Sequence, residues 1–299
     1  MKIILHKIGL ILIVLCLASC LKLDSNLFNN RQDIDTYRFD LYRGEQDFIL
    51  DSKYHIDSVY LFDLWSKTSE ETHSTKIKAC YLGKITQLKT DTVILYCHGN
   101  KWHMDFYWQR AKLLAHCNKI RPYPVLFFDY RGYGLSEGNP SENGMYADTR
   151  TCLQWLKNNG VSSDRLIIYG FSLGSAPATE ITAHTNENPI NPCKIILEAP
   201  FASASVMAQD GSCLNFSSSF FTNLKIDNAE EIKKIHIPLL WLHGTMDMFL
   251  NYKTHGWVVY KNKTDKKDSV LINNADHGEI PIKMGFENYI NTINRFIGQ

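Results

Sequence analysis

Short apolar runs alternate with amphipathic stretches along most of this chain. Two segments with alternating side chains, 57–65 and 76–84, lie on either side of a polar turn and predict an antiparallel pair of strands. From residue 92 onward, patterns of buried strands alternate with helical patterns. The predicted strands are 92–97, 124–129, 165–169, 194–198, 237–242 and 269–272, and the predicted helices are 105–117, 145–158, 173–184, 252–261 and 281–297. This alternation predicts an α/β fold with a mostly parallel eight-stranded sheet flanked by helices.

One longer stretch, between Phe201 and Ile237, interrupts the alternation. Its residues Phe216 and 217–221, which combine phenylalanines with serines, suggest a short lid or a lipid-facing wall. An ordinary packed loop is the equally good alternative. No internal repeat is visible. The sequence therefore predicts one domain over residues 56–299 with a short lid insertion.

The amino terminus has the layout of an export signal. A basic start precedes an apolar core over residues 8–17, which is too short for a membrane-spanning helix. The sequence Leu-Ala-Ser-Cys that ends at Cys20 resembles the lipobox of bacterial lipoproteins, and this resemblance implies that Cys20 is lipidated. We predict a lipoprotein signal peptide over 1–19 and a tether and N-terminal extension over 20–55. The protein is then anchored by lipid in the bacterial cell envelope, although an uncleaved anchor helix or a plain signal peptide would also fit.

The charge of the chain gives no reason to expect a nucleic-acid partner. The formal net charge is +1 at pH 7, and removal of residues 1–19, with their two lysines and no acidic residue, leaves −1. No zinc-type spacing of cysteine and histidine, phosphate loop or dinucleotide-binding glycine motif is present, so we expect no metal and no cofactor. Cys97 and Cys193 lie in predicted buried strands and are expected to be small core residues. The sequence leaves disulfide pairing and the oligomeric state open.

The most informative motif lies where the predicted strand 165–169 meets the predicted helix 173–184. Residues 170–174 read Gly-Phe-Ser-Leu-Gly, which is the form of a nucleophile elbow at a strand-to-helix turn. A strained turn exposes the serine hydroxyl, and the glycines on either side allow the strand and the helix to approach closely. Ser172 is therefore the candidate nucleophile.

A serine hydroxyl needs a base that takes its proton and an acid that orients the base. His277 is the one histidine, of the 11 in the chain, that follows the last predicted strand, and Asp247 follows the strand before it. These residues arrive in the order serine, acid, histidine that an elbow of this kind requires. Glu198 also ends a predicted strand and remains a rival for the acid. Asp247 is favoured because its loop should end beside the histidine loop.

Acyl transfer also requires N–H donors aimed at the oxyanion that develops on the substrate. The backbone amide of Leu173, directly after the candidate nucleophile, is one expected donor. The second should come from the loop after strand 92–97, which begins His98-Gly99-Asn100. Asn100 is the expected residue and Lys101 is the alternative.

Together these motifs make the chain resemble the α/β-hydrolase-fold serine hydrolases. Within that class it is similar to the small-lid group of alpha/beta-hydrolase-domain depalmitoylases and monoacylglycerol-lipase-like esterases. The stretches that carry the resemblance lie between residues 90 and 298, in the expected order: 98–100, 129–138, 169–175, 197–203, 242–247 and 276–278. The resemblance implies the α/β-hydrolase fold and a small or lipid-like acyl ester substrate. One departure is the segment 100–107, which is rich in bulky side chains, whereas the relatives usually have small residues just after His-Gly-Asn.

We therefore predict an exported, lipid-anchored serine hydrolase that cleaves a carboxylic ester or thioester through an acyl-enzyme. Ser172, His277 and Asp247 would act as nucleophile, base and orienting acid, with Asn100 and Leu173 at the oxyanion. A peptidase or amidase of the same fold is the enzymatic alternative. A binding protein that has kept the fold without turnover is the alternative of a different class.

Overall fold

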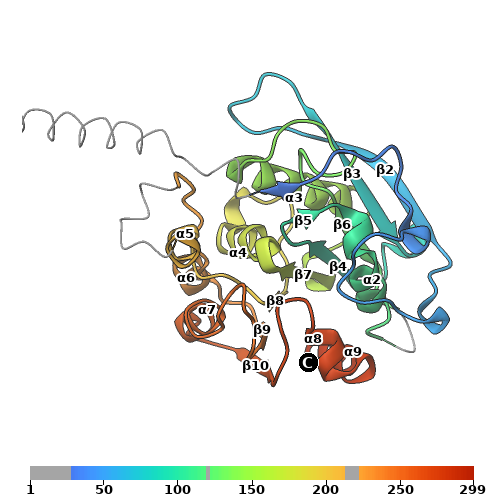
Figure 1. Cartoon of the computed structure of the whole chain (residues 1–299). Coiled ribbons are helices and arrows are strands. Elements are labelled where there is room, and N and C mark those ends of the chain that lie inside the picture. Colours follow the sequence, from blue (N-terminus) through green and yellow to red (C-terminus); the bar gives the residue numbers. More distant parts are fainter. Residues whose placement is uncertain (1–27, 119–121, 213–221) are drawn as a thin grey trace, which may run out of the picture.

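The computed structural model describes residues 28–118, 122–212 and 222–299. Its centre is an eight-stranded sheet in the order β10-β9-β8-β7-β4-β6-β3-β2 (Figure 1). The strands of this sheet are β2 (Val59–Ser66), β3 (Thr75–Leu82), β4 (Val93–Cys97), β6 (Val125–Phe128), β7 (Leu166–Phe171), β8 (Lys194–Glu198), β9 (Leu239–Gly244) and β10 (Lys267–Ile272). Strand β3 is antiparallel to both of its neighbours, and the ladder from β6 to β10 is parallel throughout. The predicted α/β fold with a mostly parallel eight-stranded sheet is confirmed.

Helices cover both faces of the sheet. They are α2 (Met104–Ala115), α3 (Glu142–Asn158), α4 (Ser175–Ala183), α5 (Ala204–Ser212), α6 (Asn228–Glu231), α7 (Gly256–Asn262), α8 (Ile280–Met284) and α9 (Phe286–Gly298). Helices α3, α4 and α7 pack on one hydrophobic cluster, and α2, α8 and α9 pack on the cluster of the opposite face. Among the described residues, no helix is long and apolar enough to span a lipid bilayer.

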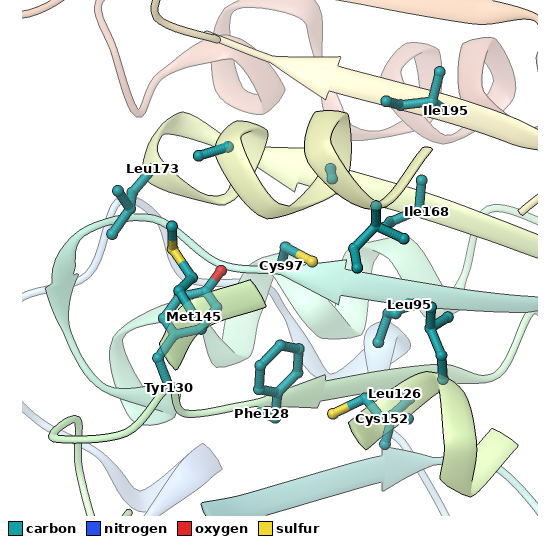
Figure 2. Packing of buried hydrophobic residues seen from close by; sticks show 14 of the residues in the cluster. Leu95, Cys97, Leu126, Phe128, Tyr130, Met145, Cys152, Ile168, Leu173 and Ile195 are labelled. Carbon is teal, nitrogen blue, oxygen red and sulfur yellow. The ribbon is translucent and has the colours of Figure 1, made fainter. Parts of the chain in front are cut away.

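The central strands are apolar on both faces because both faces are covered. Leu95 of β4 lies opposite Leu126 of β6 and Ile168 of β7 in the ladder, and Figure 2 shows these side chains on the face that α3 covers. Met145 and Cys152 of α3 pack against this row. Strands buried in this way read as continuous apolar runs rather than as alternating patterns.

Two local predictions need correction. The single helix predicted over 281–297 is two helices, because Gly285 takes a φ of 80° that ends α8 before α9 begins. Cys193 precedes β8 instead of lying within it, and it is only partly buried, whereas Cys97 is fully buried in β4. The predicted lid residues Phe216 and 217–221 lie outside the described residues, as do the predicted signal peptide and Cys20.

From Phe28 onward, the segment predicted as a tether packs onto the domain. Strand β1 (Asn29–Asn30) pairs in parallel with β5 (Lys101–Trp102), and the short helix η2 (Phe39–Leu41), in the same blue part of the chain, contacts α2 (Figure 1). Five of its side chains are buried, namely Phe28, Tyr37, Phe48, Leu50 and Tyr54. We call residues 28–55 the N-terminal extension. Its residues show no periodic hydrophobic pattern, because its contacts are irregular and long-range.

Candidate active site

The nucleophile elbow is built by a strained serine between two closely packed glycines. Ser172 follows β7 with a φ of 52°, the left-handed region that side chains seldom adopt. A Cβ on Gly174 would lie 1.9 Å from the carbonyl oxygen of Cys97, and one on Gly170 would lie 2.5 Å from the carbonyl oxygen of Gly174. Only glycine allows the turn to pack this tightly against β4. The sequence Gly-x-Ser-x-Gly is thus explained by the close approach of the backbone.

The structure brings Ser172, His277 and Asp247 together. The Oγ of Ser172 lies 2.9 Å from Nε2 of His277, and Nδ1 of the same ring lies 2.7 Å from Oδ2 of Asp247. In a neutral imidazole with its proton on Nδ1, that nitrogen donates to the carboxylate and Nε2 accepts from the serine hydroxyl. Ser172 and Asp247 are buried, and the His277 side chain is partly exposed. The arrangement is that of a hydroxyl activated by an oriented base.

Asp247 is held as a carboxylate by donors on both of its oxygens. Burial raises its pKa, but hydrogen bonds from His243 and His277 outweigh this effect and leave the pKa of Asp247 below its usual range. Oδ1 accepts the backbone N–H groups of Phe249 and Leu250, at 3.0 and 2.7 Å. Nε2 of His243 lies 3.2 Å from Oδ2. Asp247 therefore stays ionised and fixed in orientation.

His243 has a larger part in the site than the sequence suggested. It directly follows the predicted strand 237–242, and in the structure it is fully buried near the end of β9. Its Nε2 also lies 2.9 Å from the carbonyl oxygen of Leu250, so the ring connects both ends of the loop that carries Asp247. The spacing of four residues between His243 and Asp247 at a strand end is the signal that could have shown this.

Glu198, the rival acid, is engaged elsewhere. It is fully buried at the end of β8, where it forms an ion pair with Arg110 and accepts the hydroxyl of Tyr169. Tyr289 donates to the same carboxylate at 2.6 Å. The three donors occupy both carboxylate oxygens, whereas Asp247 is the acid that faces His277.

The loop expected to supply an oxyanion donor lies beside the elbow. Strands β4 and β7 are neighbours, with Cys97 opposite Gly170, so the loop that begins at His98 and the elbow emerge at the same edge of the sheet. A Cβ on Gly99 would lie 3.1 Å from the ring of Phe171. The backbone N–H of Lys101 donates to the hydroxyl of Tyr107 at 2.8 Å. This bond engages the amide of Lys101, the alternative donor, while Asn100 and Leu173 remain the expected donors.

Apolar side chains surround the base. The ring centroids of Phe171 and Phe249 lie 5.3 and 5.2 Å from that of His277. Phe249, Met246 and Met248 lie on the loop that carries Asp247 and are exposed to solvent.

In the part of the chain that the structure describes, no group of three or more His, Cys, Asp or Glu side chains is arranged to hold a metal ion.

Comparison with known proteins agrees with this fold. The family described as "Serine aminopeptidase, S33" matches residues 89–232. The uncharacterized protein YfhR of Escherichia coli K12 is 26% identical over 231 residues, which are 75% of this chain and 78% of YfhR. Alpha/beta hydrolase domain-containing protein 17B of Homo sapiens is 25% identical over 210 residues, covering 69% of this chain and 66% of its own.

Solved structures share the fold at low sequence identity. The esterase Pf2001 of Pyrococcus furiosus aligns with a TM-score of 0.63 and 16% identity, covering 91% of this chain and 97% of its own. An alpha-beta hydrolase of Vibrio vulnificus aligns with a TM-score of 0.60 and 20% identity, covering 78% and 80%. The chain is thus an α/β-hydrolase-fold hydrolase.

Proposed function

We propose that this protein is a serine hydrolase that cleaves a carboxylic ester or thioester. The single observation that carries the proposal is the chain of contacts from Ser172 through His277 to Asp247, at 2.9 and 2.7 Å, with the serine at a strained elbow. A hydroxyl with a base and an orienting carboxylate in this geometry is the arrangement that acyl transfer requires.

The proposed reaction has two halves. The Oγ of Ser172 attacks the carbonyl carbon while its proton passes to Nε2 of His277, and the resulting oxyanion accepts the N–H groups of Asn100 and Leu173. Collapse of this intermediate expels the alcohol or thiol, which takes the proton from His277. Water then attacks the acyl-enzyme while His277 takes its proton, and collapse of this second intermediate breaks the bond to Oγ, which takes the proton back from His277 as the acid product leaves. Asp247 holds the ring throughout.

The ester or thioester assignment draws on the apolar side chains beside the base and on the names of related proteins. Met246, Met248 and Phe249 offer an acyl chain an apolar surface on the loop of the triad acid. Pf2001 is named an esterase. A peptidase or amidase is the second candidate, because the matched family is described as a serine aminopeptidase. The proposed lipid anchor and envelope location draw on the lipobox-like sequence that ends at Cys20.

Covalent labelling by a fluorophosphonate probe tests this function, because the probe reports an activated serine without a natural substrate. Wild-type protein should be labelled and should hydrolyse short p-nitrophenyl esters. Ser172→Ala should keep its circular dichroism spectrum, lose the label and lose about 10⁴-fold in kcat or more. Full esterase activity in folded Ser172→Ala would refute the proposal. Parallel assays with acyl thioesters and aminoacyl p-nitroanilides separate the ester and thioester reading from the peptidase reading.

A further inference from the structure

We propose that the N-terminal extension positions the oxyanion loop, with Asn29 as the positioning residue for Asn100. We call the segment 98–102, which runs from His98 to Trp102, the oxyanion loop. The inference rests on the proposed function, because the position of this loop affects turnover only if Asn100 serves acyl transfer. The contacts that carry it come from a segment outside the eight-stranded sheet.

The side chain of Asn100 is fixed from two directions. The backbone N–H of Asn29 donates to its Oδ1 at 2.9 Å, and the hydroxyl of Tyr133 donates to the same oxygen at 2.7 Å. An amide oxygen has two lone pairs, and both are used here. The residue whose amide is the expected oxyanion donor is therefore held by the backbone of a residue 71 positions away.

The residues after Asn100 are also held by the extension. Strand β1 pairs with β5, so Asn29 lies opposite Lys101 and Asn30 opposite Trp102. Trp102 has a φ of 56°, a strained conformation for a bulky side chain. The guanidinium of Arg31 lies 4.6 Å from the centre of its indole ring. A two-residue strand has little stability of its own, so the conformation of the loop depends on these contacts.

A second connection reaches the start of the oxyanion loop through buried groups. The hydroxyl of Tyr37, in the extension, donates to Oδ2 of Asp129 at 2.6 Å. Oδ1 of Asp129 lies 3.2 Å from Nε2 of His98, and Nδ1 of His98 lies 2.7 Å from the carbonyl oxygen of Gly99. Tyr37 thus lies at one end of a row of buried contacts that reaches His98 and Gly99, the two residues that precede Asn100. The extension holds the oxyanion loop before and after the expected donor.

Such positioning should affect the chemical step more than substrate binding. Removal of an oxyanion donor costs about 10²–10³ in kcat, and a displacement of about 1 Å can cost about 100-fold. Loss of one fixing contact, with the donor still present, should therefore lower kcat by about 10-fold or more. Contacts that only stabilise the fold would lower the melting temperature and leave kcat unchanged in folded protein.

Asn29→Pro and Asn29→Ala form a matched pair in the full-length protein, because proline removes the backbone N–H and alanine keeps it. With a short p-nitrophenyl ester, kcat of Asn29→Pro should be at least about 10-fold below that of Asn29→Ala, with KM within about 3-fold. The rate of fluorophosphonate labelling should fall in parallel. Asp51→Ala, which removes a local turn contact to the N–H of Lys53 in the same extension, should behave as wild type.

Tyr37→Phe gives an independent test that keeps the aromatic ring and removes only the hydroxyl. It should also lower kcat with KM nearly unchanged, and it decides the matter if Asn29→Pro does not fold. Equal kcat values in folded Asn29→Pro and folded Asn29→Ala would overturn the positioning role. If Asn29→Pro does not fold, an unchanged kcat in Tyr37→Phe would overturn it instead. Ser172→Ala distinguishes this result from failure of the proposed function, because it must abolish turnover whatever the extension does.

Discussion

Glu198→Gln and Asp247→Asn should separate stability from catalysis. Both are buried acids at or just after strand ends, but three donors hold the carboxylate of Glu198, whereas that of Asp247 faces His277. Each substitution keeps the shape of the side chain and removes its charge. We expect Glu198→Gln to lower the free energy of unfolding while the folded protein stays active. Asp247→Asn should instead lose nearly all turnover in a protein that remains folded at neutral pH.

The size of the stability loss follows from the donors around Glu198. A glutamine has one acceptor oxygen, so if that oxygen serves Tyr169 and Tyr289, its NH₂ group faces the guanidinium of Arg110. Removing one partner of a buried ion pair costs about 3–5 kcal/mol. Arg110 still donates to Asp47 at 3.0 Å and to the carbonyl oxygen of Gly278 at 3.2 Å in the variant. The loss in free energy of unfolding should therefore lie near the lower end of this range. A loss of about 3 kcal/mol lowers the melting temperature by roughly 6–12 °C.

The catalytic effects should have the reverse order. Neutralising the orienting acid of such a triad lowers kcat by about 10⁴-fold, because the imidazole loses its correct tautomer. Glu198→Gln should stay within about 10-fold of wild type, since its carboxylate is bonded to Arg110, Tyr169 and Tyr289 rather than to the base.

Urea denaturation followed by circular dichroism measures the stability of both variants at pH 7. Hydrolysis of a short p-nitrophenyl ester, at a temperature where each variant is fully folded, measures kcat per folded molecule. A stable Glu198→Gln variant that has lost about 10³-fold or more in kcat, beside an active Asp247→Asn variant, would transfer the acid role to Glu198 and refute the reasoning.

Three further outcomes are expected. Cys20→Ser should release the protein from the membrane fraction, since acyl chains supply the proposed anchor, and an unchanged distribution between fractions would contradict this. Gly174→Ala should abolish folding or activity, because its Cβ would lie 1.9 Å from a carbonyl oxygen of β4. Its control, Gly298→Ala, should match wild type in melting temperature and kcat, because a Cβ there has no neighbour within 4 Å. Burial raises the pKa of Asp247, but hydrogen bonds lower it by more, so the pKa lies below its usual range in the folded protein. The ionised carboxylate therefore stabilises the fold above about pH 4, and this contribution is lost as the pH falls. In urea denaturation, the difference in free energy of unfolding between wild type and Asp247→Asn should shrink from about pH 5 to about pH 3.

The elements that local patterns specify could be predicted from the sequence. The strand-to-helix turn at Ser172 lies within one short segment, where apolar strand residues, two glycines and small helix residues all favour the same geometry. Asp247 and His277 are 30 residues apart, yet each follows a strand of a parallel sheet, and such strands end at one edge. The order of the elements was therefore enough to place both side chains near the elbow.

Buried charges could not be placed in this way. Arg110 lies in α2 among mixed charged and apolar residues, where an arginine is ordinarily expected in solvent, yet the whole helix is buried. The reason is a pair of carboxylates, Glu198 and Asp47, at separations of 88 and 63 residues in the chain. No periodic pattern encodes such a pairing, because each partner alone looks like a surface residue.

Two anomalies of the sequence turn out to be the two sides of one interface. Residues 101–107 are bulkier than the resemblance to the hydrolases would suggest, and the extension before residue 56 shows no periodicity. In the structure, Trp102 lies under Arg31, and the ring of His103 contacts that of Tyr37. Bulky residues beside a catalytic loop need a partner to bury them, and a segment without periodicity can supply one through irregular contacts. An unexpectedly bulky loop next to an elbow therefore indicates that a covering segment should be sought elsewhere in the chain.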